Sequence, residues 1–230
     1  MSEPSRPFCL CLAGPNGSGK STLTAKIRTL HTLDNWIDPD VVARQLGDEA
    51  TAFAAARNQR VDFAQQLSDF GFETVFSHSS NADFLDALKT LGYEVHLYFV
   101  CTDDPQINVS RVSNRVSLGG HDVPTPKITE RYWRSLDNLG HSIGKFDRVV
   151  LFDNSSVEGQ GRVVGQVTNA PRSRIALYPR PHLPVWIVRM LSKTYLQRMN
   201  PAGPEPMLYE NPWYHDDPAR RKQLLDQFRM

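Results

Sequence analysis

Apolar and polar positions predict strands that alternate with helices along the first 155 residues. Residues 7–13 and 93–101 are short apolar runs, as in strands buried on both faces. Further strands are predicted at 34–38, 72–76, 148–152 and 162–168. Apolar residues at helical spacing between them predict helices near 19–30, 50–69, 81–91, 105–117 and 125–139. This alternation predicts an α/β fold with a parallel sheet covered by helices on both faces.

The sequence changes character after about residue 170. Nine of the sixteen prolines lie at or beyond Pro171, and a helix is predicted at 184–199. A chain of 230 residues fits one α/β domain with an addition. We therefore expect a domain over 1–170 and a helical, proline-rich extension over 171–230 that packs on it.

Charge and cysteine content exclude several classes of protein. The net charge of +1 gives no overall field that would attract nucleic acid or a membrane surface. Three cysteines, an odd number, favour reduced thiols over a disulfide framework. No signal peptide or membrane span is apparent, so we expect a cytoplasmic protein without nucleic-acid or membrane partners.

The clearest motif is G-x-x-x-x-G-K-[ST] at Gly14–Ser21, between a predicted strand and a predicted helix. Glycines let backbone N–H groups converge on phosphate oxygens at the positive end of the helix. The motif predicts that Lys20 contacts the β- and γ-phosphates and that Ser21 binds Mg²⁺. The alternative is a glycine-rich structural turn. The predicted nucleotide-binding residues are Gly14, Pro15, Asn16, Gly17, Ser18, Gly19, Lys20, Ser21 and Thr22.

The motif at Gly14–Ser21 is a P-loop, which several classes of nucleotide-binding protein share. GTPases and motor ATPases fit the rest of the sequence less well. A guanine-selecting N-K-x-D is absent, and the D-x-x-G at Asp137–Gly140 lies inside a helical pattern. No pair of acidic residues ends a long apolar strand, as a motor ATPase requires. A small-molecule kinase remains, with its ligands at the carboxyl ends of the strands.

The predicted strand 34–38 ends in Asp38, a candidate substrate-binding residue, and Asp40 follows two residues later. A kinase needs a carboxylate near the γ-phosphate to accept the proton of the attacking hydroxyl, and Asp40 is the candidate. The alternative is structural, with Asp38 as an N-cap and Asp40 as a first-turn acid.

Glu73 interrupts an otherwise apolar strand. A buried lone carboxylate is costly unless it binds a metal, a substrate or a counter-charge, so Glu73 is a candidate substrate or magnesium-shell group. The alternative is a partly exposed edge position. Thr74 and Ser77 are further candidates for the acceptor site, although the residues around His78 also fit a polar turn that caps the next helix.

Arginines flank a glycine pair at Gly119-Gly120. Arg111 and Arg115 share one predicted helical face, and Arg131 and Arg134 share another. A hinged segment of this kind would close over the phosphates and exclude water, with Arg111 and Arg115 the preferred catalytic candidates. Solvated helix surfaces are the alternative. In addition, His121 is a candidate for contact with the acceptor, and Asn154, after the strand 148–152, lies where the nucleotide base is expected.

Residues 8–155 together resemble the zeta toxins, a family of bacterial P-loop kinases. The resemblance rests on AGPNGSGKST, the D-x-D at 38–40, FET at 72–74, RVxxRVxxGGHDVP from 111, the following I-x-x-RY-x-RSL, and FDNS at 152–155. It implies phosphorylation of the 3′-hydroxyl of the amino sugar of UDP-N-acetylglucosamine, with ATP or GTP and Mg²⁺ as cofactors.

Carried over by motif, the resemblance implies Asp40 as the base and Glu73 at the acceptor sugar. Arg111 and Arg115 would clamp the phosphates, and Asn154 would hold the adenine. The family also leaves open an antitoxin protein as a partner. Longer members of the family carry a threonine or glycine pattern after the strand glutamate, whereas Val75 and Phe76 follow Thr74 here. This difference bears on the identity of the acceptor more than on the phosphoryl transfer itself.

Two hypotheses remain at this point. The first is a kinase for a small acceptor, most simply a nucleotide sugar or another nucleotide-like compound. The second is a nucleotide-dependent binding switch whose proline- and aromatic-rich extension contacts a partner.

Overall fold

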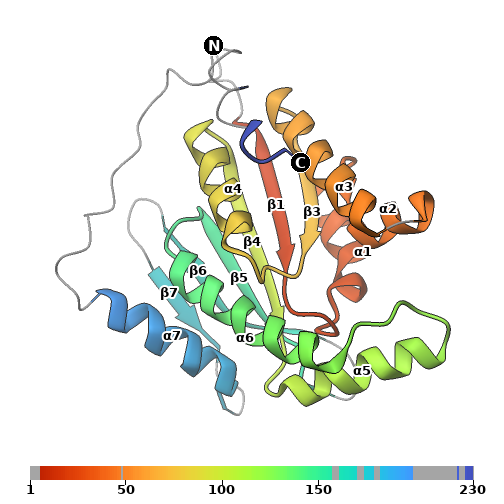
Figure 1. Cartoon of the computed structure of the whole chain (residues 1–230). Coiled ribbons are helices and arrows are strands. Elements are labelled where there is room, and N and C mark those ends of the chain that lie inside the picture. The colour runs from red at the N-terminus through yellow and green to blue at the C-terminus, as the bar shows by residue number, and fades with distance from the viewer. Residues whose placement is uncertain are drawn as a thin grey trace.

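The computed structural model describes residues 6–47, 49–156, 161–169, 174–178, 182–198, 222 and 226–229. Within these residues a sheet of seven strands runs in the order β2-β3-β1-β4-β5-β6-β7 (Figure 1). The strands are β1 Phe8–Ala13, β2 Trp36–Ile37, β3 Phe70–Thr74, β4 Glu94–Cys101, β5 Arg148–Asp153, β6 Arg162–Thr168 and β7 Arg174–Leu177. The helices are α1 Lys20–His31, α2 Pro39–Leu46, α3 Glu49–Gln65, α4 Ser79–Thr90, α5 Pro105–Ser117, α6 Thr125–Ser142 and α7 Val185–Arg198.

Strand β1 lies in the middle of the sheet and pairs in parallel with both β3 and β4. Its side chains alternate between two apolar layers: Cys9 and Cys11 enter the larger core, whereas Leu10 and Leu12 enter the smaller one. The continuous apolar run in the sequence arises because both faces of the strand are covered. The cysteines are free and buried, as expected for reduced thiols.

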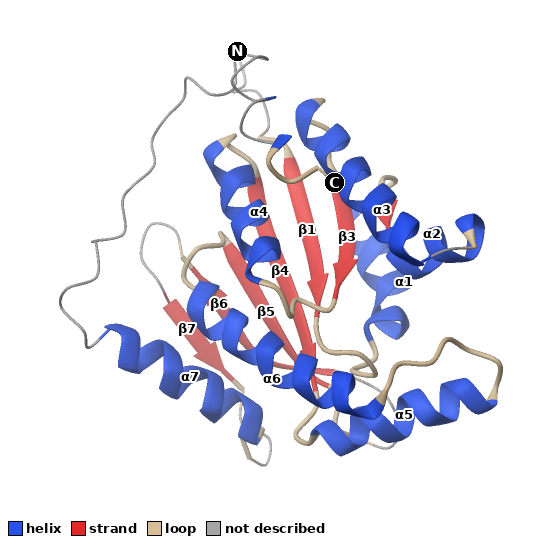
Figure 2. Cartoon of the chain, in the orientation of Figure 1, coloured by secondary structure: helices blue, strands red, loops and turns tan. Residues whose placement is uncertain are grey.

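Helices cover the two faces unequally (Figure 2). The larger core is formed by the sheet with α3, α4, α6 and α7, and the smaller core by the sheet with α1. The expected α/β fold with a mostly parallel sheet flanked by helices is therefore confirmed.

Two strands correct the expectation of a wholly parallel sheet. β6 pairs with β5 and β7 pairs with β6, and both pairings are antiparallel. Only eight residues separate the end of β5 from the start of β6, which is too few for the helical crossover that a parallel strand requires. The third strand is also shifted: it was expected at 72–76 but spans Phe70–Thr74, and Phe76 turns away with a φ of 62°.

Elements beyond residue 170 belong to the same packed structure. β7 extends the sheet, and α7 confirms the helix expected at 184–199 and packs beside α6. Trp186 of α7 is 1% exposed, packs against Phe99, and donates its indole N–H to Asp153 Oδ1 at 3.2 Å. The proline-rich residues 199–221 lie outside the described residues, and the division at residue 170 stays a prediction.

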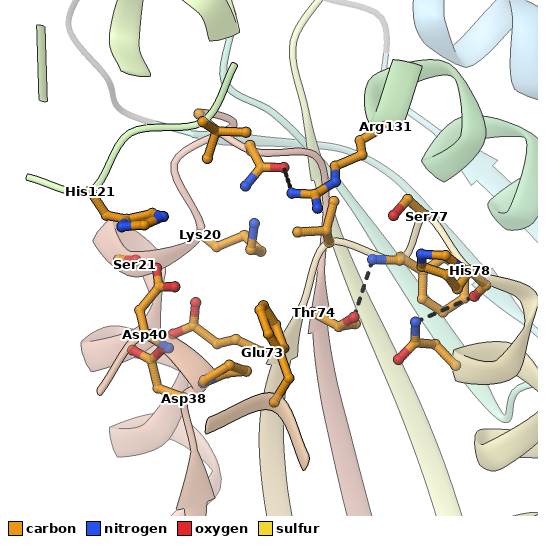
Figure 3. Close-up of a pocket in the computed structure, with 18 of the residues that line it drawn as sticks. Lys20, Ser21, Asp38, Asp40, Glu73, Thr74, Ser77, His78, His121 and Arg131 are labelled. Carbon is orange, nitrogen blue, oxygen red and sulfur yellow. Dashed lines mark hydrogen bonds between the residues drawn. The ribbon is translucent and has the colours of Figure 1, made fainter. Parts of the chain in front are cut away.

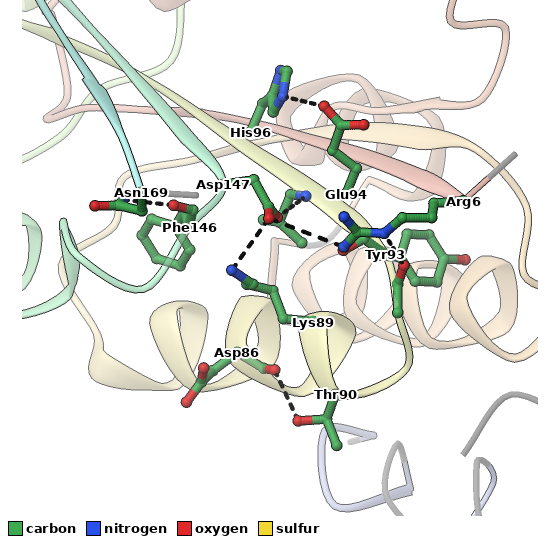
Figure 4. A network of polar contacts seen from close by, with 12 residues as sticks. Arg6, Asp86, Lys89, Thr90, Tyr93, Glu94, His96, Phe146, Asp147 and Asn169 are labelled. Atoms are coloured by element: carbon green, nitrogen blue, oxygen red, sulfur yellow. Dashed lines mark hydrogen bonds and ion pairs between the residues drawn. The ribbon is translucent and has the colours of Figure 1, made fainter. Parts of the chain in front are cut away.

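A polar network closes the end of the sheet opposite the P-loop (Figure 4). The Asp147 carboxylate accepts a hydrogen bond from the Val95 backbone N–H at 2.8 Å and lies 3.3 Å from Lys89 Nζ. Arg6 adds hydrogen bonds to the carbonyls of Gly92 and Tyr93. These contacts fix the start of β4, so the strand enters the sheet in a defined register. None of the described helices is long and apolar enough to span a membrane.

The packing of α7 predicts that Trp186 stabilises the whole domain. Trp186→Ala removes a fully buried indole and leaves the Asp153 carboxylate without that donor, so we expect a loss of about 3–5 kcal/mol in the free energy of unfolding. Chemical denaturation followed by circular dichroism measures it. Val188→Ala, at a position on the same helix that is 56% exposed, is the control and should change stability by less than about 0.5 kcal/mol. A Trp186→Ala variant as stable as the wild type would contradict an integral role for α7.

Candidate active site

A cavity of about 680 Å³ lies at the carboxyl ends of the central parallel strands (Figure 3). Its walls come from the turn between β1 and α1, the start of α2, the end of β3, α3, α5 and α6. Figure 3 shows Ser21, Asp38, Asp40 and Glu73 on one side of Lys20, and His78 and Arg131 on the other. The fold thus brings together most of the side chains that the sequence singled out.

The P-loop backbone requires its glycines. Gly14, Gly17 and Gly19 have φ angles of 148°, 74° and 96°. A Cβ atom on Gly14 would lie 2.1 Å from the Val100 carbonyl oxygen, and one on Gly17 would lie 2.5 Å from the Asn108 carbonyl oxygen. Both the left-handed backbone and the close approach of neighbouring chain exclude a side chain at these positions.

Lys20 lies at the first position of α1, inside the cavity. Its Nζ donates hydrogen bonds to the carbonyl oxygens of Gly14 at 2.8 Å and Pro15 at 3.3 Å, so the ammonium group is held within its own loop. Burial lowers the pKa of Lys20, and the carboxylates of Glu73, Asp40 and Asp38 act in the opposite direction. Helix α1 also has no side-chain cap at Gly19 and no acid in its first turn, which leaves its positive end open to an anion.

Three side chains from distant segments support the P-loop from outside. Asn108 of α5 donates to the Asn16 carbonyl at 2.6 Å, and Asn154 donates to the Ser18 carbonyl at 2.8 Å. Arg131 of α6 reaches the Asn16 side-chain oxygen at 3.4 Å. Asn154 is buried beneath the loop and does not line the cavity, so its contact with a nucleotide base stays a prediction.

The two aspartates occupy the positions that the sequence suggested. Asp38 is the N-cap of α2 and accepts the Asp40 backbone N–H at 2.9 Å, which confirms the capping interpretation for this residue. Because that cap fixes the first turn of α2, Asp40 lines the cavity two residues later, and its negative charge acts on Lys20. The geometry is thus compatible with a catalytic role for Asp40 as well as with its place in the first turn.

Glu73 is buried in the middle of the sheet. It is 6% exposed, and β3 lies between β2 and β1, so the alternative of an exposed edge position is wrong. Burial raises the pKa of its carboxyl group, and the Thr24 hydroxyl, which donates to Glu73 Oε1 at 2.5 Å, works against that rise together with Lys20. Glu73 therefore ties β3 to α1 directly beneath the P-loop lysine.

The end of β3 turns sharply towards α4. The Thr74 hydroxyl accepts the Phe76 N–H at 3.2 Å, and this contact stabilises the left-handed conformation of Phe76. Thr74 and Ser77 both line the cavity, and Ser77 is buried. His78 is the N-cap residue of α4, so the predicted turn before this helix is present. The His78 side chain, however, makes no capping hydrogen bond to the helix.

The arginines around the glycine pair differ in their surroundings. Arg111 and Arg115 line the cavity, and each donates to a nearby carbonyl, that of Ser156 at 2.9 Å and that of His121 at 2.7 Å. Arg131 lines the cavity as well. Arg134, in contrast, pairs with Glu130 one turn earlier at 3.1 Å and is absent from the cavity wall. Closure of this segment over a ligand stays a prediction, as do the roles of its arginines.

Several residues of the site were missed by the sequence analysis. Thr24 and Asn108 contact the site only through tertiary hydrogen bonds, and no local motif marks them. Arg57 and Arg60 of α3 and Lys127 of α6 also line the cavity. A sequence signal did exist for α3, because Phe53, Arg57 and Arg60 recur at helical spacing.

Comparisons with known proteins place the chain in a family. No family model matches it. A protein of Haemophilus influenzae, described as uncharacterized, is 30% identical over 125 residues, which cover 52% of this chain and 88% of that protein. The chain belongs to the same family as this protein.

Solved structures show the fold type. The AvrRxo1-ORF1:-ORF2 structure with ATP matches with a TM-score of 0.64 and 13% identity, covering 99% of this chain and 78% of that chain. A structure of the PezAT chromosomal toxin–antitoxin system of Streptococcus pneumoniae matches with a TM-score of 0.52 and 16% identity, covering 69% of this chain and 71% of that chain. The chain thus has a P-loop kinase fold of the zeta toxin and AvrRxo1 type.

The support of the P-loop by Asn108 can be tested separately from catalysis. Asn108→Ala leaves the Asn16 carbonyl without its buried donor, and we expect the affinity for MgATP to fall about five- to tenfold, as for the loss of one hydrogen bond. Isothermal titration calorimetry measures this. Asn114→Ala, at an exposed position of the same helix, is the control and should bind as the wild type does. Unchanged affinity in Asn108→Ala would show that the loop is held by other contacts.

Proposed function

We propose that the chain is a kinase that uses ATP and Mg²⁺ to phosphorylate a hydroxyl of a nucleotide-activated sugar similar to UDP-N-acetylglucosamine. The observation that carries the proposal is the group of Asp38, Asp40 and Glu73 around Lys20, in one cavity with the P-loop. A module that only binds nucleotide needs the P-loop, but it does not need carboxylates and a second wall of polar groups beyond it. The bound ATP of the AvrRxo1-ORF1:-ORF2 structure supports ATP as the donor.

The residues of the cavity can bind Mg²⁺ only if the phosphate oxygens of ATP supply some of its ligands. Within the described residues, no group of three histidine, cysteine or acidic side chains is close enough to hold a metal ion. Ser21 has an exposed hydroxyl at the start of α1, and the nearby side chains offer oxygen ligands, which Mg²⁺ prefers together with phosphate oxygens. When bound, the ion would neutralise charge on the phosphates.

In this proposal, residues of the chain bind the phosphates, accept the proton of the acceptor hydroxyl and stabilise the transferred group. Lys20 and the backbone N–H groups of the P-loop bind the phosphates of ATP. Asp40 accepts the proton of the acceptor hydroxyl and orients its oxygen for attack on the γ-phosphorus. Arg111 and Arg115, with Arg131 as a third candidate, stabilise the negative charge of the transferred group. Thr74, Ser77 and His121, which also line the cavity, are proposed to contact the acceptor.

Toxicity and an antitoxin partner remain proposals. The PezAT structure comes from a toxin–antitoxin system, and AvrRxo1-ORF1 is bound to AvrRxo1-ORF2 in its structures. Because both neighbours are less than 25% identical to this chain, they support the fold and only suggest such a partnership. The binding switch would be favoured over the kinase if tight ATP binding were found without any phosphorylated product.

The base assignment predicts a separation of binding from turnover. Asp40→Asn should lower the rate of phosphoryl transfer about 10²- to 10⁴-fold and leave the affinity for MgATP within about threefold. Lys20→Ala should weaken nucleotide binding as well as abolish transfer. Transfer is followed with labelled ATP and UDP-N-acetylglucosamine, and by the mass gain of one phosphoryl group in a metabolite extract.

Asp83→Asn is the matched control for this experiment. Asp83 is an exposed aspartate of α4 outside the cavity, so its variant should show wild-type rates. Full turnover by Asp40→Asn would refute Asp40 as the base. A purified wild-type protein that binds ATP but forms no product with any acceptor in the extract would refute the kinase itself.

A further inference from the structure

The cavity extends beyond the P-loop along one face of the sheet, between α3 and α4. On α3, Phe53, Arg57 and Arg60 follow one another at spacings of four and three residues and all line this part of the cavity. Neighbouring positions Ala52 and Ala56 are buried and hold the helix against the core. One face of α3 therefore presents two arginines to a space that the proposed mechanism leaves unassigned.

Arg60 is held in a fixed position by aromatic rings. Its guanidinium carbon lies 4.6 Å from the centroid of the Phe72 ring and 5.6 Å from that of Phe84. One N–H group donates to Asn81 Oδ1 at 3.4 Å. A guanidinium carries five donors, and this is the one side-chain acceptor that it has within the described residues. The remaining donors are available to a ligand that enters the cavity.

No acidic side chain of the described residues balances this charge. None lies within 4 Å of the Arg60 guanidinium. Burial lowers the pKa of Arg60 to about 10, and Cys11 is the largest of the contributions that raise this pKa. Arg57, whose charge also lowers the pKa of Arg60, adds a second positive charge. The aromatic faces offset part of the cost of burying a cation, but an apolar side chain of the same size would fill this space without that cost.

The sheet register gives the depth of this arginine. Phe72, on which Arg60 lies, pairs with Cys11 on β1 and stands two residues before Thr74, where β3 ends. Two residues of a strand span roughly 6–7 Å. Along the strand direction, Phe72 therefore lies about that far from the end of β3, and Arg60 lines the same cavity as Lys20 and Asp40.

We propose that Arg60, with Arg57 beside it, binds an anionic group of the acceptor, either a phosphoryl group or a carboxylate. This inference rests on the proposed function, because it takes the cavity as the acceptor site. The fixed guanidinium pairs with two oxygens of such a group through parallel hydrogen bonds, and the apolar rings of Phe53, Phe84 and Phe228 line the space next to it. The acceptor is then an acidic hydroxyl compound, and neutral sugars and simple alcohols are poor substrates.

The test measures binding, so that it does not depend on phosphoryl transfer. The full chain is saturated with Mg²⁺ and the non-hydrolysable ATP analogue AMPPNP, which occupies the P-loop, and is then titrated calorimetrically with phenyl phosphate, phenylacetate and benzyl alcohol. These probes share a ring that suits the aromatic wall and differ in charge. We expect at least one of the two anions to bind, and benzyl alcohol to bind at least tenfold more weakly.

Two variants of Arg60 and one control define the site. Arg60→Met keeps an unbranched apolar stem without the guanidinium and should weaken binding of the anion at least tenfold, whereas Arg60→Lys keeps the charge without the planar fork and should retain part of the affinity. Arg28→Met changes an exposed arginine outside the cavity and should bind the anion as the wild type does. AMPPNP affinity and the melting temperature of each variant report on the P-loop and on folding.

Each result has a definite meaning. Binding of the same anion with equal affinity by wild type and Arg60→Met, in a folded variant, overturns the proposal, and so does a wild-type protein that binds neither anion. Preference for phenyl phosphate or for phenylacetate assigns the group as phosphoryl or carboxylate. Failure of the kinase assay would leave these results intact, and failure of anion binding would leave the kinase assay intact.

Discussion

The burial of the Lys20 ammonium group is the constraint on which the rest of the site depends. A cation at this depth is stable because the carbonyls of its own loop accept hydrogen bonds from it and because Glu73, Asp40 and Asp38 supply compensating charge. In the proposed function the same ammonium group contacts phosphate oxygens when ATP binds. The loop carbonyls would then occupy the hydrogen-bonding positions of the phosphate oxygens and hold the lysine side chain in place until ATP binds.

The sheet order makes this arrangement possible. β1 carries the P-loop at its end, and its neighbours β3 and β4 bring Glu73 and the segment before α5 to the same edge. Parallel strands all end at one edge, so residues far apart in the chain converge there. The antiparallel strands β6 and β7 extend the sheet on the far side of β5, and no residue of either strand lines the cavity.

The sequence predicted those parts of the site that local chemistry determines. The P-loop motif, the cap at Asp38 and the alternation of strands and helices depend on neighbours in the chain, and the structure reproduces them. Asn108, Thr24 and Arg60 were missed because their roles exist only through contacts across the fold. The direction of β6 was missed although the sequence held a signal for it, because the predicted strands 148–152 and 162–168 are too close together for the helical crossover that a parallel pair needs.

The charges of the cavity also give the acceptor an orientation. Carboxylates of Asp38, Asp40 and Glu73 gather at the end nearest Ser21, whereas Arg57 and Arg60 lie along α3. In the proposed complex ATP occupies Lys20 and the P-loop, so the carboxylates disfavour a second anionic group beside them, whereas Arg57 and Arg60 favour one along α3. An acidic acceptor would then enter with its charged group towards Arg60. Its uncharged hydroxyl would then face Asp40 and the nucleotide. With ATP bound, this placement of charge would favour the productive orientation over the reversed one, before any contact with the reacting hydroxyl is made.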